Sequence, residues 1–332
     1  MFDISMVRIL PMSPKIPFIK MRIIAGIISV VAVLFSLFLF FSNGLNYGID
    51  FKGGSVIQFT MDQQPDVEAI RSAGNALNIG DVGVQTISLS GSDLPGVRLS
   101  YALQDPEAPF EGTEDEISLK DARLQQDTLE RVQTMLETEF GVQRVNMSAS
   151  VLGSKVSGEL RTKGMIAVVA SLTMVLLYIW IRFEWQFALG AVIALAHDVA
   201  LTLGVFELLQ IEFNLSIVAA ILTIVGYSLN DTVIVYDRIR ENLRKYKKML
   251  LPDVLNLSIN DTLSRTIMTS LTTLLALFSL YILGGEGLRG FSFAMIWGVF
   301  VGTYSSIFVA SPLLLLLGVK RPSGEPERAV AV

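Results

Sequence analysis

Long apolar runs dominate this chain, and each is long enough to cross a bilayer as a helix. About 20 apolar residues in helical form span the hydrocarbon core of a membrane. Such runs predict transmembrane helices over residues 23–42, 164–181, 187–206, 213–236, 266–285 and 290–317. The last run continues to Val319 and contains Pro312, which predicts a kink or an early exit there. The pattern therefore indicates a polytopic α-helical membrane protein with six transmembrane helices.

The first run, residues 23–42, also resembles the apolar core of a signal peptide. It is longer than such cores usually are, and no small-residue cleavage site follows it. We therefore expect this run to remain attached as the first span.

Cationic residues are distributed unevenly over the segments that join the spans. The segments on one side hold 15 Lys and Arg residues, whereas the two short loops on the other side hold Arg289 alone. The side that is rich in cations usually faces the cytoplasm. The prediction is a cytoplasmic location for residues 1–22, 237–265 and 320–332, and a location on the opposite, outer side of the membrane for residues 43–163.

Residues 43–163 have the composition of a water-soluble domain. Between Asn46 and Lys163 there are 18 acidic and 10 basic residues. Alternating apolar positions, helical periodicity and turn residues predict strands over 55–61, 82–90, 96–103 and 142–152, and helices over 65–78 and 117–140. This βαββαβ order predicts a ferredoxin-like α+β domain between the first and second spans. An acidic segment over 105–116 is expected to be a solvated loop.

Composition narrows the chemistry that the chain can perform. The residues are 52% hydrophobic and 17% charged, and none is cysteine, which excludes disulfides, thiolate metal sites and cysteine nucleophiles. The single His197 cannot form a site with several histidine ligands. We expect no enzyme activity, no metal, no cofactor and no nucleic-acid partner. An intramembrane hydrolase is disfavoured because His197 and Asp198 lack an evident nucleophile.

Ionisable residues inside the predicted spans are the candidate functional residues. Each costs about 2.5 to 3.5 kcal/mol at the bilayer centre on insertion scales, so each requires a partner, water or a task. Span three carries His197 and Asp198, span four carries Asn230 and Asp231, and Arg265 lies at the start of span five. One cytoplasmic segment joins spans four and five, so Asp231 and Arg265 enter the membrane at similar depth. The sequence therefore predicts an ion pair between them.

Two interpretations of these residues remain open. Polar side chains in spans often serve only as interhelical hydrogen bonds, worth about 0.6 to 2 kcal/mol each. His197 bonded to Asp198 would be such a structural pair, and Arg265 at a span end could extend to the interface. Alternatively, Asp231 exchanges its cationic partner for a proton, which removes its charge and relaxes the helix contact. The second interpretation makes Asp231 a proton switch.

Five segments of the chain resemble the SecD/SecF family of bacterial protein-export membrane proteins. They are 46–56 (NYGIDFKGGSV), 156–160 (VSGEL), 194–203 (ALAHDVALTL), 226–242 (GYSLNDTVIVYDRIREN) and 264–274 (SRTIMTSLTTL). Together with the layout of one span, one inserted domain and five further spans, the resemblance covers the chain from about residue 20 to residue 318.

The resemblance implies a half-transporter of the resistance-nodulation-division superfamily in the bacterial inner membrane. It implies that the chain pairs with SecD beside the SecYEG channel and uses the proton-motive force to assist preprotein translocation. YidC and YajC are further partners that the resemblance suggests. It links Asp231 and Arg265 to proton passage, and we add as lesser candidates Asn230, Thr232, His197 and Asp198.

Two other functions remain as alternatives. A half-transporter of the same superfamily could export lipids or small solutes, although such proteins usually carry a second large outer domain. A passive assembly scaffold would use the polar residues of its spans for helix packing alone.

Overall fold

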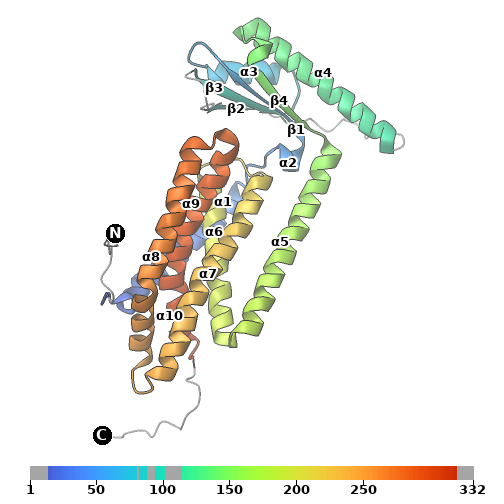
Figure 1. The fold of residues 1–332 in the computed structure, drawn as a ribbon. Helices are drawn as coiled ribbons and strands as arrows, with labels where there is room; N and C mark the ends of the chain where they lie inside the picture. Colours follow the sequence, from blue (N-terminus) through green and yellow to red (C-terminus); the bar gives the residue numbers. More distant parts are fainter. Residues whose placement is uncertain (1–13, 81, 88–93, 102–113, 320–332) are drawn as a thin grey trace, which may run out of the picture.

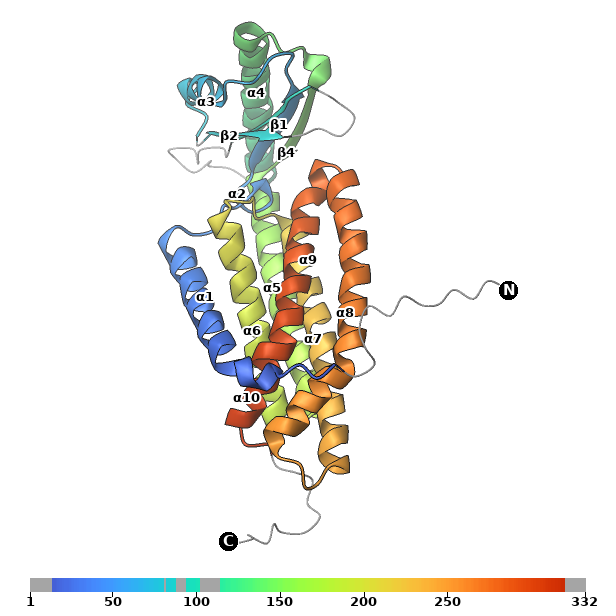
Figure 2. The same cartoon turned by 90° about the vertical axis from the view of Figure 1, so that its left-hand side faces the viewer.

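The computed structural model describes residues 14–80, 82–87, 94–101 and 114–319 and consists of a helical bundle with a small α/β domain at one end. Figures 1 and 2 show the domain above the bundle, with α1 and α5 rising toward it. Residues 1–13 and 320–332 of the predicted cytoplasmic ends lie outside the described residues, as does most of the acidic segment 105–116.

Six helices in the described residues are long and apolar enough to cross a membrane, which confirms the predicted number of spans. They are built on α1 (Arg22–Ser42), α5 (Ser154–Arg182), α6 (Trp185–Leu208), α7 (Leu215–Lys245), α8 (Leu251–Leu283) and α9 (Glu286–Ser305). Apolar side chains on α1 and α5 point away from the bundle, as at Phe41 and Trp180, which are 81% and 78% exposed. Surfaces of this kind require lipid or a partner helix.

Helices α7 and α8 extend far beyond the predicted spans. The predicted loop 237–265 is mostly helical, and only residues 246–250 connect the two helices. Charged residues end an apolar run but do not end a helix, and here they stabilise the extension. Arg238 pairs with Asp261 at 2.7 Å, and the buried Asn242 donates to Ser258 at 3.0 Å. Arg265 therefore lies inside α8 and not at its start.

The last span changes its helical form before Pro312. Helix α9 passes into a π-helical turn, Ser306–Ala310, and then into α10 (Ser311–Leu316), which has Pro312 in its first turn. Proline is tolerated there because the first amides of a helix need no intrahelical acceptor.

The α/β domain has the predicted βαββαβ order. Its elements are β1 (Gly54–Thr60), α3 (Val67–Ala76), β2 (Val82–Ile87), β3 (Gly96–Tyr101), α4 (Glu114–Phe140) and β4 (Met147–Leu152). The sheet order is β2-β3-β1-β4, and every neighbouring pair is antiparallel. This is a ferredoxin-like arrangement. The predicted strand ends at 88–90 and 102–103 lie outside the described residues.

One face of this sheet is apolar and the other is polar, as alternation along the strands requires. Ile57, Phe59 and Leu99 are fully buried in a core with Val132 and Leu136 of α4. Helices α3 and α4 cover this face in Figures 1 and 2. The opposite face carries polar side chains and faces the bundle, where it meets the loop between α6 and α7.

Candidate functional site

Asp231 is buried in the bundle and held by two hydroxyl groups. Its side chain is 6% exposed. Thr266 of α8 donates to Oδ1 at 2.6 Å, and Ser306 of the π-turn donates to Oδ2. The acid therefore joins three segments, because α7 carries it while α8 and the π-turn supply its donors.

Asp198 of α6 is a second buried acid, and it is 1% exposed. Nδ1 of His197 lies 2.8 Å from Oδ1, while Ser228 of α7 and Ser305 of α9 donate to Oδ2 at 2.5 and 2.8 Å. The His197 ring stacks on Tyr304. Its Nε2 has no hydrogen-bond partner in the part of the chain that the structure describes.

Asp231 and Arg265 do not form the expected ion pair. No salt bridge of Arg265 occurs among the described residues, and its side chain is exposed on this chain, as is that of Asn230. Successive residues on a helix point about 100° apart, and Thr266 faces Asp231 instead. Of the six sequence candidates, Thr232, His197, Asp198 and Asp231 are buried.

Sequence reasoning missed the hydroxyl donors on α9 and its π-turn. Ser305 and Ser306 lie in a run without charged residues. The cost of burying a charge, which marked Asp198 and Asp231 as candidates, does not apply to these neutral hydroxyl groups. The spacing Gly298, Gly302, Ser306 is a repeat of small residues at i+4, which is typical of close helix packing in membranes. An added Cβ at Gly302 would lie 3.1 Å from Cβ of Ser228. This repeat is the signal that could have identified the α7–α9 contact.

The α/β domain contacts the bundle at one junction. We define the junction as residues 46–53, residues 209–214 of the α6–α7 loop, and Arg98 of β3. Arg98 pairs with Glu212 at 3.1 Å, and the two side chains are 22% and 16% exposed. The Asp50 carboxylate accepts from the first amide of α7, that of Leu215, at 2.9 Å. The domain and the bundle are therefore joined by charged groups as well as by the chain.

Backbone contacts strengthen the junction. The Phe213 amide donates to the Asn46 carbonyl at 2.7 Å, and the Gly48 amide donates to the Phe213 carbonyl at 2.9 Å. A Cβ at Gly48 would lie 2.5 Å from Oε1 of Glu212, so a side chain at this position would displace the Glu212 carboxylate. Gly53, with φ of 74°, provides the left-handed turn that leads from α2 (Ile49–Lys52) into β1.

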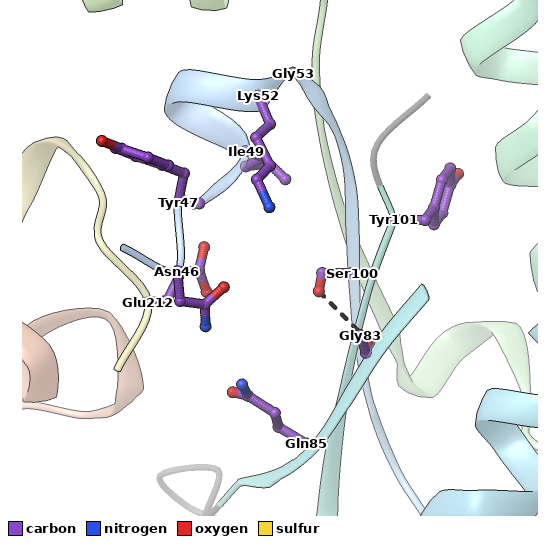
Figure 3. A pocket seen from close by; sticks show the side chains of 11 residues that line it. Asn46, Tyr47, Ile49, Lys52, Gly53, Gly83, Gln85, Ser100, Tyr101 and Glu212 are labelled. Atoms are coloured by element: carbon purple, nitrogen blue, oxygen red, sulfur yellow. Dashed lines mark hydrogen bonds between the residues drawn. The ribbon is translucent and has the colours of Figure 1, made fainter. Parts of the chain in front are cut away.

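Two polar cavities border the Arg98–Glu212 pair. One of about 150 Å³ is lined by Asn46, Lys52, Gln85, Ser100 and Glu212, whose side chains surround the space in Figure 3. The other, of about 220 Å³, lies between Arg98, Glu212, Asp50 and the serines of β4. Burial raises the pKa of the Glu212 carboxyl, Arg98 opposes this shift, and Asp50 adds to it. Glu212 is therefore a titratable group at the junction.

Comparisons with known proteins match both the bundle that holds the buried acids and part of the junction. The family model for the C-terminal part of the SecD/SecF protein export membrane proteins matches residues 131–320, and the model for the SecD/SecF GG motif matches residues 38–65. The chain belongs to the SecD/SecF family. The first match contains Asp198, Asp231, Ser305 and Ser306. The second match contains residues 46–53 of the junction.

Curated members of the family match the chain over nearly their whole length. The protein translocase subunit SecF of Rhodobacter capsulatus is 45% identical over 88% of this chain and 86% of its own. That of Rickettsia bellii is 38% identical over 95% of this chain and 97% of its own. Family membership thus makes the chain a translocase subunit of the SecF type, a transport protein of the bacterial inner membrane with several spans.

Solved structures of SecDF have the same fold. The crystal structure of SecDF from a Thermus species, a translocon-associated membrane protein, matches with a TM-score of 0.77 at 32% identity. It matches 93% of this chain, which spans about 40% of the length of that SecDF chain. A second SecDF structure, in a super-membrane-facing form, matches with a TM-score of 0.63 at 32% identity. The likeness to one part of a longer SecDF chain supports a SecD partner.

Proposed function

We propose that this chain is the SecF half of a proton-driven SecD–SecF unit, which uses the proton-motive force to assist preproteins through SecYEG across the bacterial inner membrane. In this proposal the termini are cytoplasmic, residues 43–163 are periplasmic, and Asp231 carries the proton. The single observation that supports it most is the buried Asp231 carboxyl, held between α7, α8 and the π-turn by hydroxyl groups.

Protonation of Asp231 would change the contacts of three helices. An ionised carboxylate accepts from both Thr266 and Ser306, whereas the neutral acid carries a hydrogen of its own and holds these donors less strongly. One charge that crosses 100 mV releases about 2.3 kcal/mol, which is comparable with one such hydrogen bond to a charged group. The gradient therefore supplies enough free energy to shift this contact.

The junction offers a path from the bundle to the α/β domain. Helix α6 carries Asp198, helix α7 carries Asp231, and the loop between them carries Glu212, which pairs with Arg98 of the sheet. A shift of α7 relative to α8 would move this loop and, through it, the domain. The domain would then act on a preprotein that leaves SecYEG, with the lipid bilayer, YidC and YajC as further neighbours.

Complementation of a secretion defect tests this proposal. In cells depleted of their own SecF-type subunit, the chain should restore export of a periplasmic reporter protein. Asp231→Asn should still co-purify with SecD but should not restore export. Full export by this variant would refute the role of Asp231. A failure of the unaltered chain to bind SecD would refute the proposed assembly.

A further inference from the structure

Two serines that are adjacent in sequence connect the two buried acids. Ser305 is the last residue of α9, and Ser306 is the first residue of the π-turn. Ser305 donates to Asp198 at 2.8 Å, and Ser306 donates to Asp231. Both serines are fully buried. One short segment therefore contacts an acid on α6 and an acid on α7.

Each serine hydroxyl has a second acceptor within reach. Oγ of Ser305 lies 3.1 Å from the carbonyl of Gly302, and Oγ of Ser306 lies 3.1 Å from the carbonyl of Thr303. A hydroxyl has one hydrogen and donates it in one direction at a time. Beside an ionised acid it points to the carboxylate, and beside a neutral acid it can accept the acid's hydrogen and donate to the carbonyl. The protonation of each acid thus selects the orientation of its serine.

The backbone around the serines is suited to transmit such a change. Single π-turns inside helices are rare and often occur at functional sites. The Gly302 carbonyl belongs to the turn that packs against Ser228, and Ser228 itself donates to Asp198 at 2.5 Å. A shift of the segment from Gly302 to Ser306 would move Ser305, a donor to Asp198, together with Ser306, a donor to Asp231.

We propose that Asp198 is a second proton-binding group, and that Ser305 and Ser306 are positioning residues that couple its protonation to that of Asp231. The inference rests on the proposed function of Asp231. Among the described residues, the titratable and charged groups placed beside the two acids are His197, which bonds to Asp198 and stacks on Tyr304, and Arg265, which is adjacent on α8 to the Thr266 that donates to Asp231.

A purely structural role for the serines predicts a different result. Serine in membrane helices often donates to a carbonyl of the preceding turn, and this bond serves helix packing alone. In that case, replacing a serine changes the titration midpoint of the acid that it touches and leaves the midpoint of the other acid unchanged. The effect of Ser305 on Asp231, which it does not touch, therefore separates the two roles.

Infrared spectroscopy of the full chain in lipid nanodiscs measures this effect. The band of protonated carboxyl groups is followed against pH and assigned with Asp231→Asn and Asp198→Asn. We expect Asp198→Asn to move the Asp231 midpoint by at least about 0.5 pH unit, since coupled sites titrate as a pair. We expect Ser305→Ala to move the Asp231 midpoint by a similar amount. In the double variant Ser305→Ala/Ser306→Ala, Asp198→Asn should move the Asp231 midpoint by at most half as much as it does in the parent.

Ser292→Ala is the matched control for these variants. Ser292 lies on the same helix α9, is fully buried, and its Oγ has no hydrogen-bond partner among the described residues. Its replacement should leave both midpoints unchanged. The inference is overturned if Asp231 titrates but its midpoint responds to neither Asp198→Asn nor Ser305→Ala. An Asp231 band that never titrates would instead overturn the proposed function.

Discussion

Replacement of Arg98 by glutamine should loosen the junction between the α/β domain and the bundle. The change removes the cation that lies 3.1 Å from Glu212, and the pair is only 22% and 16% exposed. Exposed ion pairs contribute about 0 to 1 kcal/mol, whereas removal of one partner from a buried pair costs about 3 to 5 kcal/mol. For this partly buried pair we expect a cost of about 2 kcal/mol, which lowers the equilibrium constant for docking about 30-fold.

The effect should depend on pH in a defined direction. Burial raises the pKa of Glu212, and Arg98 opposes that shift. Without Arg98 the pKa of the docked carboxyl rises further, so the docked state of the variant binds a proton more tightly than the undocked state. Docking of Arg98→Gln is therefore favoured at low pH and is lost as the pH rises through this raised pKa.

Distances between spin labels measure this docking. Because the chain contains no cysteine, Val145→Cys on the α/β domain and Leu283→Cys at the end of α8 provide the two labelling sites. We expect one narrow distance distribution for the parent, a broad one for Arg98→Gln at pH 8, and a narrower one for the variant at pH 5.

The exposed pair of Arg144 and Glu137, which lies within the domain, provides the control. Arg144→Gln should leave the distribution unchanged. Equal distributions for the parent and Arg98→Gln at pH 8 would refute the role assigned to the junction.

Three further predictions concern the bundle. Gly298→Ala places a methyl group against Ile224 and should cost about 1 to 3 kcal/mol, seen as a lower Tm in detergent, whereas Gly226→Ala, with open space around it, should not lower the Tm. Asn242→Ala removes the amide that donates to Ser258 and Asp261 and should lower the free energy of unfolding by about 1 to 3 kcal/mol, again seen as a lower Tm. The control Ser264→Ala, at an exposed position, should change this free energy by less than about 0.5 kcal/mol. Thr266→Val removes a hydroxyl donor 2.6 Å from Asp231 and should reduce the stimulation of export by the proton-motive force several-fold. Thr266→Ser keeps the hydroxyl and should retain the stimulation. Equal stimulation in the two variants would contradict the role of this hydroxyl.

The sequence predicted the architecture well because its signals are strong. Apolar runs of about 20 residues leave few alternatives to membrane helices, and the alternation of residues in 43–163 predicted the correct order of strands and helices. Helix ends were predicted less well. The charged hairpin of α7 and α8 stays helical because Arg238, Asp261 and Asn242 bond across it, which a hydropathy pattern does not reveal.

Part of the candidate site was also accessible from the sequence. Burial of Asp198 and Asp231 follows from the cost of a charge in lipid, because each must find partners inside the bundle. The identity of those partners depends on helix rotation. A difference of one position on α8 directs Thr266 instead of Arg265 to Asp231. Ser305 and Ser306 reach the acids only because small residues let α7 and α9 approach closely.

Preprotein translocation in inverted membrane vesicles tests the central claim most directly. The vesicles contain the chain with its SecD partner, and export is measured with and without a proton-motive force. Asp231→Asn should abolish the stimulation by the proton-motive force and leave the remaining export unchanged. Asp237→Asn, on the same helix in an exposed pair with Arg182, should retain the stimulation. Equal stimulation in Asp231→Asn and in the parent would contradict the account.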